Sequence, residues 1–399
     1  MTPIIWRLLA GRTFAAFATA LIPTTLTLAL VRTGSAGDLG LVLACELLPM
    51  LLLLPVAGVA ADRFPARRVV LVADLVRAAA QLATGYVLMA GPADVPRLAV
   101  LAAVTGAAVA FGTPSARTLV AAAVPEDGRL RVNTRLGVAT GLAQIAAPAA
   151  AGVLMLAIGA GWSSLLTGVL FLLSALTLGR LPVAPVPRST PRGSFGAELR
   201  GGWAETRRHP WFLANVLAHG AWHLAAGLLL TLGPLIAVES LGGETSWVVI
   251  AQVGTVGMLA GVWAAGRLPV RRPLYAVAFG AAVQALPLTA FALRLPLPVT
   301  AAAFCCSMFG LGVLSPLWET EMQRRIPLEA LGRVGSFDTL ISFAARPLGL
   351  AAAAPLAAVA GTTAPLLAAA VLTAAANLSV LLLPDVRERP GRESAFALR

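Results

Sequence analysis

Long apolar stretches alternate with short polar loops along the whole chain. A helix needs about 20 mostly apolar residues to cross a bilayer. On that criterion the pattern predicts twelve spans, at 11–31, 39–60, 68–90, 97–122, 134–159, 163–182, 211–238, 246–267, 273–293, 297–318, 335–359 and 363–384. We therefore expect an all-α polytopic membrane protein with twelve transmembrane helices.

The composition agrees with a bilayer as the natural solvent of this chain. Of its 399 residues, 58% are hydrophobic and 12% are charged, whereas a soluble domain has about 25% charged residues. The formal net charge is +12, and every basic residue is arginine. Because the arginines lie between apolar stretches, they favour a membrane protein, and we expect no nucleic-acid partner. The absence of lysine excludes a G-x-x-x-x-G-K phosphate loop, and with it a Walker-type ATPase in this chain.

The arginines also predict how the chain is oriented. They concentrate in alternate loops, at 63–68, 129–135, 188–208, 267–272 and 324–333, and in the C-terminal tail. The intervening loops hold only Arg32, Arg97 and Arg294. Positively charged loops face the cytoplasm in most membrane proteins. We therefore predict a multi-pass protein of the inner (plasma) membrane with both termini in the cytoplasm.

The two halves of the chain resemble each other. Residues 60–68 align with 264–272, and Pro114 and Pro125 align with Pro316 and Pro327 at nearly the same offset. Parallel repeats of six helices place a substrate path between the halves. Phe195, Leu199 and Trp203 recur every four residues, which predicts a short amphipathic helix on the cytoplasmic membrane face. We predict four segments: a six-helix bundle at 1–182, a cytoplasmic linker at 183–209, a second six-helix bundle at 210–385 and a cytoplasmic tail at 386–399.

The loop after the second predicted span resembles the signature G-x-x-x-D-R-x-G-R-R of the major facilitator superfamily. The matching residues are Gly58, Asp62, Arg63, Arg67 and Arg68, with Pro65-Ala66 in place of the usual residue and glycine. Other stretches resemble the drug, macrolide and siderophore exporter branch of that superfamily, namely D-L-V-R-A from Asp74, P-S-A-R from Pro114, V-P-E-D from Val124 and I-P-L-E-A-L-G-R-V-G-S from Ile326. The resemblance covers the whole chain and implies two pseudo-symmetric six-helix bundles.

The resemblance also implies a conformational latch, meaning a contact that holds the two halves together on the cytoplasmic side. In the superfamily, the aspartate matching Asp62 contacts the beginning of the eleventh helix, and a carboxylate is favoured at a helix N-terminus. That helix is expected to begin near residues 332–334. The implied latch residues are Gly58, Asp62, Arg63, Arg67, Arg68 and Arg333. The alternative is a solvated loop that only orients the chain.

A second charged group lies inside the predicted spans. Asp74 and Arg77 are one helical turn apart, a spacing that allows them to pair. Charged side chains within a membrane are usually paired and directed toward the protein interior. Arg117, near the cytoplasmic end of the fourth span, is expected to join them. This cluster is either a static brace or a moving gate.

Several single residues are candidates for proton or substrate contact. Glu46 is an acid with no basic residue within one helical turn, and a carboxylate that changes protonation state suits a proton-coupled exporter. Asn215, His219 and His223 share one face of the seventh span, and histidine titrates near neutral pH. Gln144 is an intramembrane amide that can line a cavity. For each, the alternative is a polar side chain satisfied by water or by neighbouring helices.

Together these features predict a secondary active transporter. We expect a proton-coupled exporter, an antiporter of a lipophilic or amphipathic small molecule, which works by alternating access as a monomer. An importer or uniporter of a neutral small molecule with the same fold is the alternative. A non-transporting scaffold or a polytopic membrane enzyme is less favoured, because no catalytic constellation is evident. We expect no cofactor and no metal, since neither the cysteines nor the His219/His223 pair has further ligands nearby in the sequence.

Overall fold

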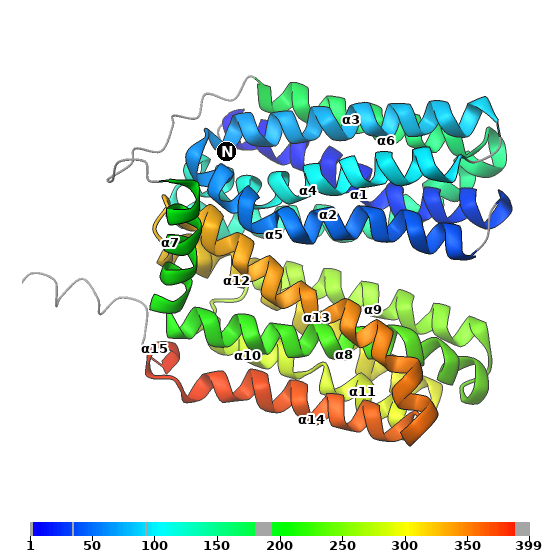
Figure 1. The fold of residues 1–399 in the computed structure, drawn as a ribbon. Helices are drawn as coiled ribbons and strands as arrows, with labels where there is room; N and C mark the ends of the chain where they lie inside the picture. The colour runs from blue at the N-terminus through cyan, green and yellow to red at the C-terminus, as the bar shows by residue number, and fades with distance from the viewer. Residues whose placement is uncertain (1–2, 34–35, 92–93, 180–193, 388–399) are drawn as a thin grey trace, which may run out of the picture. The chain divides into compact units, whose positions relative to one another are not determined.

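The computed structural model describes residues 3–33, 36–91, 94–179 and 194–387, and all its regular elements are helices. Twelve stretches of the described residues are long and apolar enough to cross a membrane, which confirms the predicted number. The first six are α1 (Pro3–Thr33), α2 (Ala36–Arg63), α3 (Ala66–Ala90), α4 (Val95–Ala123), α5 (Glu126–Ala157) and α6 (Ala160–Gly179) (Figure 1). The later helices are α7 (Phe195–Arg208), α8 (Pro210–Ser240), α9 (Glu244–Ala265), α10 (Pro273–Ala282), α11 (Ala285–Ala292), α12 (Leu297–Arg325), α13 (Leu331–Ala360), α14 (Thr363–Ser379) and α15 (Pro384–Arg387), with a 3-10 turn at Val380–Leu382.

Several helices extend beyond the predicted spans, and α5 and α12 show why. Helix α5 begins at Glu126 instead of 134, and α12 continues to Arg325 instead of ending at 318. Both extensions are charged, with acids in the first turn of α5 and Arg324 and Arg325 in the last turn of α12. Because of the helix dipole, negative charge is favourable at the N-terminal end of a helix and positive charge at its C-terminal end. The apolar criterion misses such ends, because it records only the residues that suit hydrocarbon.

One predicted span, 273–293, is divided into α10 and α11 at Val283 and Gln284. Proline has no amide hydrogen, and its ring clashes with the carbonyl four residues earlier. Pro287 stands four residues after Val283, so the break falls where a continuous helix would meet that clash. The Ser307 hydroxyl donates a hydrogen bond to the Gln284 side chain, both buried. The two pieces still form one candidate span, Pro273–Ala292.

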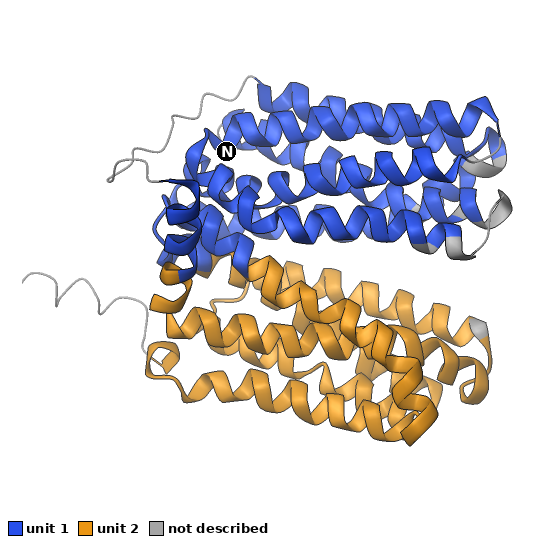
Figure 2. Cartoon of the chain, viewed as in Figure 1, with its two compact units in different colours: residues 1–203, 322–337 blue, residues 204–321, 338–399 orange. Residues whose placement is uncertain are grey.

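The chain contains two compact units, coloured separately in Figure 2. Unit 1 consists of residues 1–203 and 322–337, and unit 2 of residues 204–321 and 338–399. Unit 1 thus contains α1 to α6, residues 195–203 of α7, the last turn of α12 and the first two turns of α13. Local hydropathy gives no sign of this exchange, because it depends on contacts between segments that are distant in the sequence.

Within unit 1 the helices lie side by side (Figure 1), and α2 packs mainly on α4 while α3 packs on α6 and α4. Small residues allow close approach. A Cβ atom on Gly106 of α4 would clash with the backbone carbonyl of Glu46 on α2. Such contacts are typical of helices in membranes, where close packing replaces the hydrophobic effect as the source of cohesion.

Within unit 2, α8 packs on α14 and α9, and α14 packs on α10 and α11. Its buried core is centred on Leu229, Ile236, Phe291 and Leu366. The amphipathic segment of the predicted linker forms α7. Residues 183–193 of that linker and residues 388–399 of the predicted tail lie outside the described residues.

Candidate functional site

Asp62 at the end of α2 binds the first turn of α13 within unit 1. Its Oδ1 atom accepts a hydrogen bond from the Gly332 amide at 2.8 Å, and Oδ2 accepts from the Arg333 amide at 3.1 Å. The Arg333 Nε atom also donates to Oδ2, at 2.8 Å, and the Asp62 side chain is fully buried. The first amides of a helix have no partner inside the helix. A carboxylate placed there therefore satisfies them and meets the positive end of the helix dipole.

Gly58 lies one turn before Asp62 and allows this contact sterically. A Cβ atom at Gly58 would stand 2.9 Å from the Arg333 Cα atom and would clash with the Ser336 side chain. The backbones of α2 and α13 therefore meet at this point. The glycine of the signature loop is thus needed for space, and the aspartate supplies the hydrogen bonds.

Helix α7 adds Glu198 to the same cluster, a residue that the sequence analysis did not single out. Glu198 pairs with Arg63, with Arg63 Nε at 3.0 Å from Oε2 and Nη2 at 3.3 Å from Oε1. Arg333 Nη1 donates to the Glu198 carbonyl at 3.4 Å. Trp203 of α7 lies against Phe337 of α13, with ring centroids 5.6 Å apart. The aromatic face expected on the membrane surface thus also packs on protein.

Arg117 contacts α13, whereas the sequence predicted that it would join Asp74 and Arg77. Its Nη1 atom donates to the Gly335 carbonyl at 2.9 Å. Nearby on α5, Arg129 donates to the Gln323 carbonyl at 2.7 Å, and Asn133 donates to the Gln323 side chain at 3.0 Å. Segment 322–337 is therefore held by side chains of α2, α4 and α5. Arg67 is half-buried and Arg68 is exposed.

Asp74 and Arg77 pair inside unit 1, and both are buried. The partners of Asp74 that the sequence analysis missed are Arg12 of α1, whose Nη1 atom is 3.3 Å from Oδ2, and Ser174 of α6, which donates at 2.7 Å. Arg77 also lies over the Phe171 ring, 4.5 Å from its centroid. Because α1, α3 and α6 all contribute, this arrangement favours the static brace over the moving gate.

Glu46 lies in α2, half-buried, and its side chain makes no hydrogen bond or ion pair with the described part of the chain. An isolated carboxylate in a candidate span is costly in hydrocarbon, so such a residue is usually functional and faces water or the protein interior. Gln144 on α5 is exposed. The structure does not bring either residue into a hydrogen-bonded cluster with other described residues.

The predicted polar face of α8 is surrounded by aromatic rings of unit 2. Asn215 is buried and donates to the Trp211 carbonyl at 2.7 Å, a bond within its own helix. His219 is edge-on to Trp318, with centroids 5.0 Å apart, and His223 lies 4.1 Å from the Phe343 ring. His219 Nε2 and His223 Nδ1 are buried without a hydrogen-bond partner among the described residues.

Arg346 of α13 is a further charged residue that the sequence analysis passed over. It lies in a candidate span and is half-buried. An arginine in an otherwise apolar stretch was a visible signal for it. Among the described residues, no group of three or more His, Cys, Asp or Glu side chains is placed to hold a metal ion.

Twelve spans in two compact units, with charged side chains gathered at helix ends and in one buried cluster, are typical of a membrane transporter. Residues 8–350 match the Major Facilitator Superfamily. The chain is 30% identical over 379 residues to the multidrug efflux pump Tap of Mycobacterium tuberculosis, covering 90% of this chain and 88% of the relative. It is 23% identical over 325 residues to macrolide efflux protein A of Streptococcus pyogenes, covering 80% of each.

A solved bacterial homologue of the iron transporter ferroportin, in an outward-facing state, superposes with a TM-score of 0.76 and 20% identity, covering 96% of this chain and 100% of that one. The likeness in structure supports the fold. This chain therefore belongs to the Major Facilitator Superfamily and is a transporter, not an enzyme. The family, the fold class and the multi-pass membrane nature that the sequence predicts are confirmed.

Proposed function

We propose that this protein is a proton-coupled exporter of lipophilic or amphipathic small molecules that works by alternating access. The observation that carries the proposal is its similarity, along 90% of its length, to a multidrug efflux pump. The similarity to a macrolide efflux protein points the same way.

Glu46 is the proposed proton carrier. It is a half-buried acid in α2 without a partner among the described residues, so no ion pair holds it in the charged form. A carboxylate that gains a proton on one side of the membrane and loses it on the other can couple the proton gradient to cargo movement. His219 and His223 are the proposed cargo contacts, because their rings are flanked by aromatic side chains and each has a buried nitrogen without a described partner.

The proposed role of Asp62 and its partners is the latch. Three hydrogen bonds to the buried Asp62 carboxylate must break before the start of α13 can separate from α2. The docked state, in which these bonds are made, is therefore distinct from the separated state. The proposed orientation places this cluster, with the basic loops, at the cytoplasmic face of the inner membrane. We propose that the transporter works as a monomer.

The test is transport of ethidium, a lipophilic cation, in everted membrane vesicles that hold the protein. Acidifying the vesicle lumen should drive ethidium inward through the wild type, and a protonophore should abolish this uptake. Glu46→Gln should reduce uptake to the rate of vesicles without the protein, because an amide carries no proton. Glu239→Gln, at the exposed end of α8, is the matched control and should transport normally.

Two results would contradict the proposal. Equal, protonophore-sensitive transport by Glu46→Gln would remove Glu46 from the coupling. Ethidium uptake by intact cells instead of efflux would favour the importer.

A further inference from the structure

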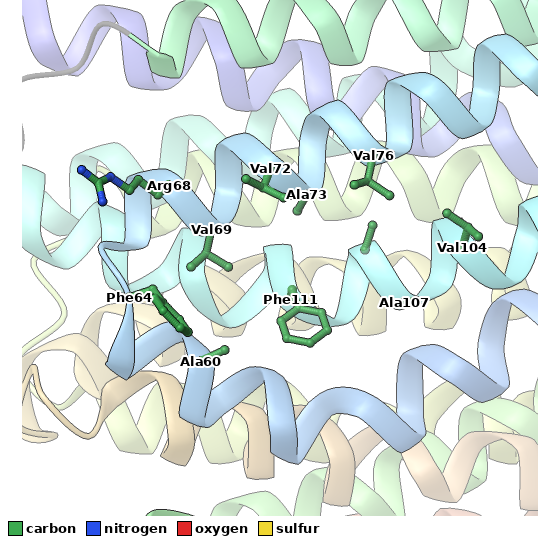
Figure 3. A pocket seen from close by; sticks show the side chains of 11 residues that line it. Ala60, Phe64, Arg68, Val69, Val72, Ala73, Val76, Val104, Ala107 and Phe111 are labelled. Carbon is green, nitrogen blue, oxygen red and sulfur yellow. The ribbon is translucent and has the colours of Figure 1, made fainter. Parts of the chain in front are cut away.

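An apolar groove lies on unit 1 between α2, α3 and α4. Its volume is about 500 Å³, and its walls include Phe64 of the turn after α2, Val72 and Val76 of α3, and Phe111 of α4. Figure 3 shows these side chains along the groove, with the Arg68 guanidinium at one end. Among the described residues that line the groove, Arg68 alone has a polar side chain, and its guanidinium lies beyond the apolar side chains at one end. The groove itself is therefore apolar, with one positive charge just outside that end.

The length and position of the groove match one leaflet of a bilayer. Arg68 and Val76 are eight residues apart on α3, which corresponds to about 12 Å along a helix. One leaflet of hydrocarbon is about 15 Å thick, half of a bilayer core. Arg68 lies in the first turn of α3, at the end of the candidate span Ala66–Ala90, where we expect the lipid headgroups. The groove therefore extends from headgroup level toward the middle of the membrane.

The chemistry of the groove distinguishes between possible occupants. Phe64 and Val72 are more than half exposed, although both are apolar, and an alkyl chain covers such a surface without needing hydrogen bonds. Arg68 has no hydrogen bond or ion pair from its side chain to any described residue. Its charge attracts a phosphate and repels a cationic cargo. An anionic phospholipid satisfies both ends of the groove.

We propose that this groove is a binding site for an anionic phospholipid, with one acyl chain between α2, α3 and α4 and the phosphate on Arg68. The lipid fills space beside α2, which packs mainly on α4. Phe64, which lines the groove, is two residues after Asp62, which binds the start of α13. This site is separate from the proposed cargo contacts on α8.

The test is native mass spectrometry of the full-length protein in detergent, with phosphatidylglycerol or phosphatidylcholine of identical acyl chains. The wild type should retain phosphatidylglycerol about fivefold better than phosphatidylcholine, the preference expected for one basic residue at the membrane surface. Arg68→Gln should bind both lipids equally, and Arg68→Lys should keep the preference. Arg97→Gln removes the same charge from the opposite end of α4 and should behave as wild type.

A second variant tests the apolar body of the groove. Ala107→Phe places a ring in the groove from α4 and should lower retention of both lipids, while its elution in size-exclusion chromatography shows whether it is folded. Unchanged lipid selectivity in Arg68→Gln would overturn the proposal. Displacement of bound phosphatidylglycerol by tetraphenylphosphonium, with wild-type sensitivity in Arg68→Gln, would assign the groove to cationic cargo and also overturn it.

Discussion

Replacing Asp62 with asparagine should release the start of α13 while keeping the size of the side chain. The asparagine carbonyl can still accept from the Gly332 amide. Its NH2 group, however, would face the amide and the Nε atom of Arg333, which are both donors. Two hydrogen bonds to a charged acceptor are then lost, at about 1.5 kcal/mol each. The docked state should be weakened by about 3 kcal/mol, or about a hundredfold in its equilibrium constant.

Amide hydrogen exchange measured by mass spectrometry follows this change directly. In the Asp62→Asn variant, the peptide covering residues 326–340 should exchange up to about a hundredfold faster than in the wild type, because opening of that segment limits exchange. Asp94→Asn is the matched control. Asp94 also receives a helix amide, from Arg97 at 3.1 Å, but at the start of α4. Exchange in 326–340 should be normal in that variant.

A double-variant cycle with Arg333→Gln sharpens the test. Residues in direct contact give non-additive effects, so Asp62→Asn should accelerate exchange much less when Arg333 is already replaced. Wild-type exchange of 326–340 in Asp62→Asn would refute the assignment of Asp62 as the residue that holds α13. Additive effects of the two substitutions would refute the pairing with Arg333.

Two further predictions concern sites within unit 1. Gly58→Ala should accelerate exchange of 326–340 as well, because the added Cβ would stand 2.9 Å from the Arg333 Cα atom; Gly179→Ala, with its nearest neighbour 3.9 Å away, should not. Asp74→Asn should lower the free energy of unfolding by about 3–5 kcal/mol, since it leaves the buried Arg77 charge without its carboxylate. The thermal unfolding midpoint in detergent measures this loss, and a midpoint equal to wild type would show that Asp74 does not brace the bundle.

The number of helices followed from the sequence because hydrocarbon imposes one requirement on every span, about 20 apolar residues with internal backbone hydrogen bonds. The helix ends were harder to predict. The first turn of α5 and the last turn of α12 are charged, so they resemble loops in a hydropathy pattern. The break between α10 and α11 was visible only as Pro287, and other spans contain proline without dividing, as α4 does at Pro114.

Only part of the candidate site was predictable from the sequence. The resemblance of Gly58 to Arg68 to a family signature pointed to Asp62 and to the first turn of α13. Glu198 escaped notice because it lies in a linker, and only its position on α7 brings it to Arg63. Arg117 was assigned to Asp74 on the basis of depth in the membrane. It contacts the Gly335 carbonyl, because helix packing decides which neighbours a side chain meets at a given depth.

The amino-acid sequence by itself determined that the protein lies in a bilayer, how many helices cross it and which family the protein belongs to. Each of these depends on composition and on local order along the chain. Only the tertiary structure decided the partners: Arg12 and Ser174 for Asp74, and residues 322–337 as part of unit 1. It also decided that Arg68, at the edge of the signature loop, ends an apolar groove. These relations join residues far apart in sequence, and they exist only after the helices have packed.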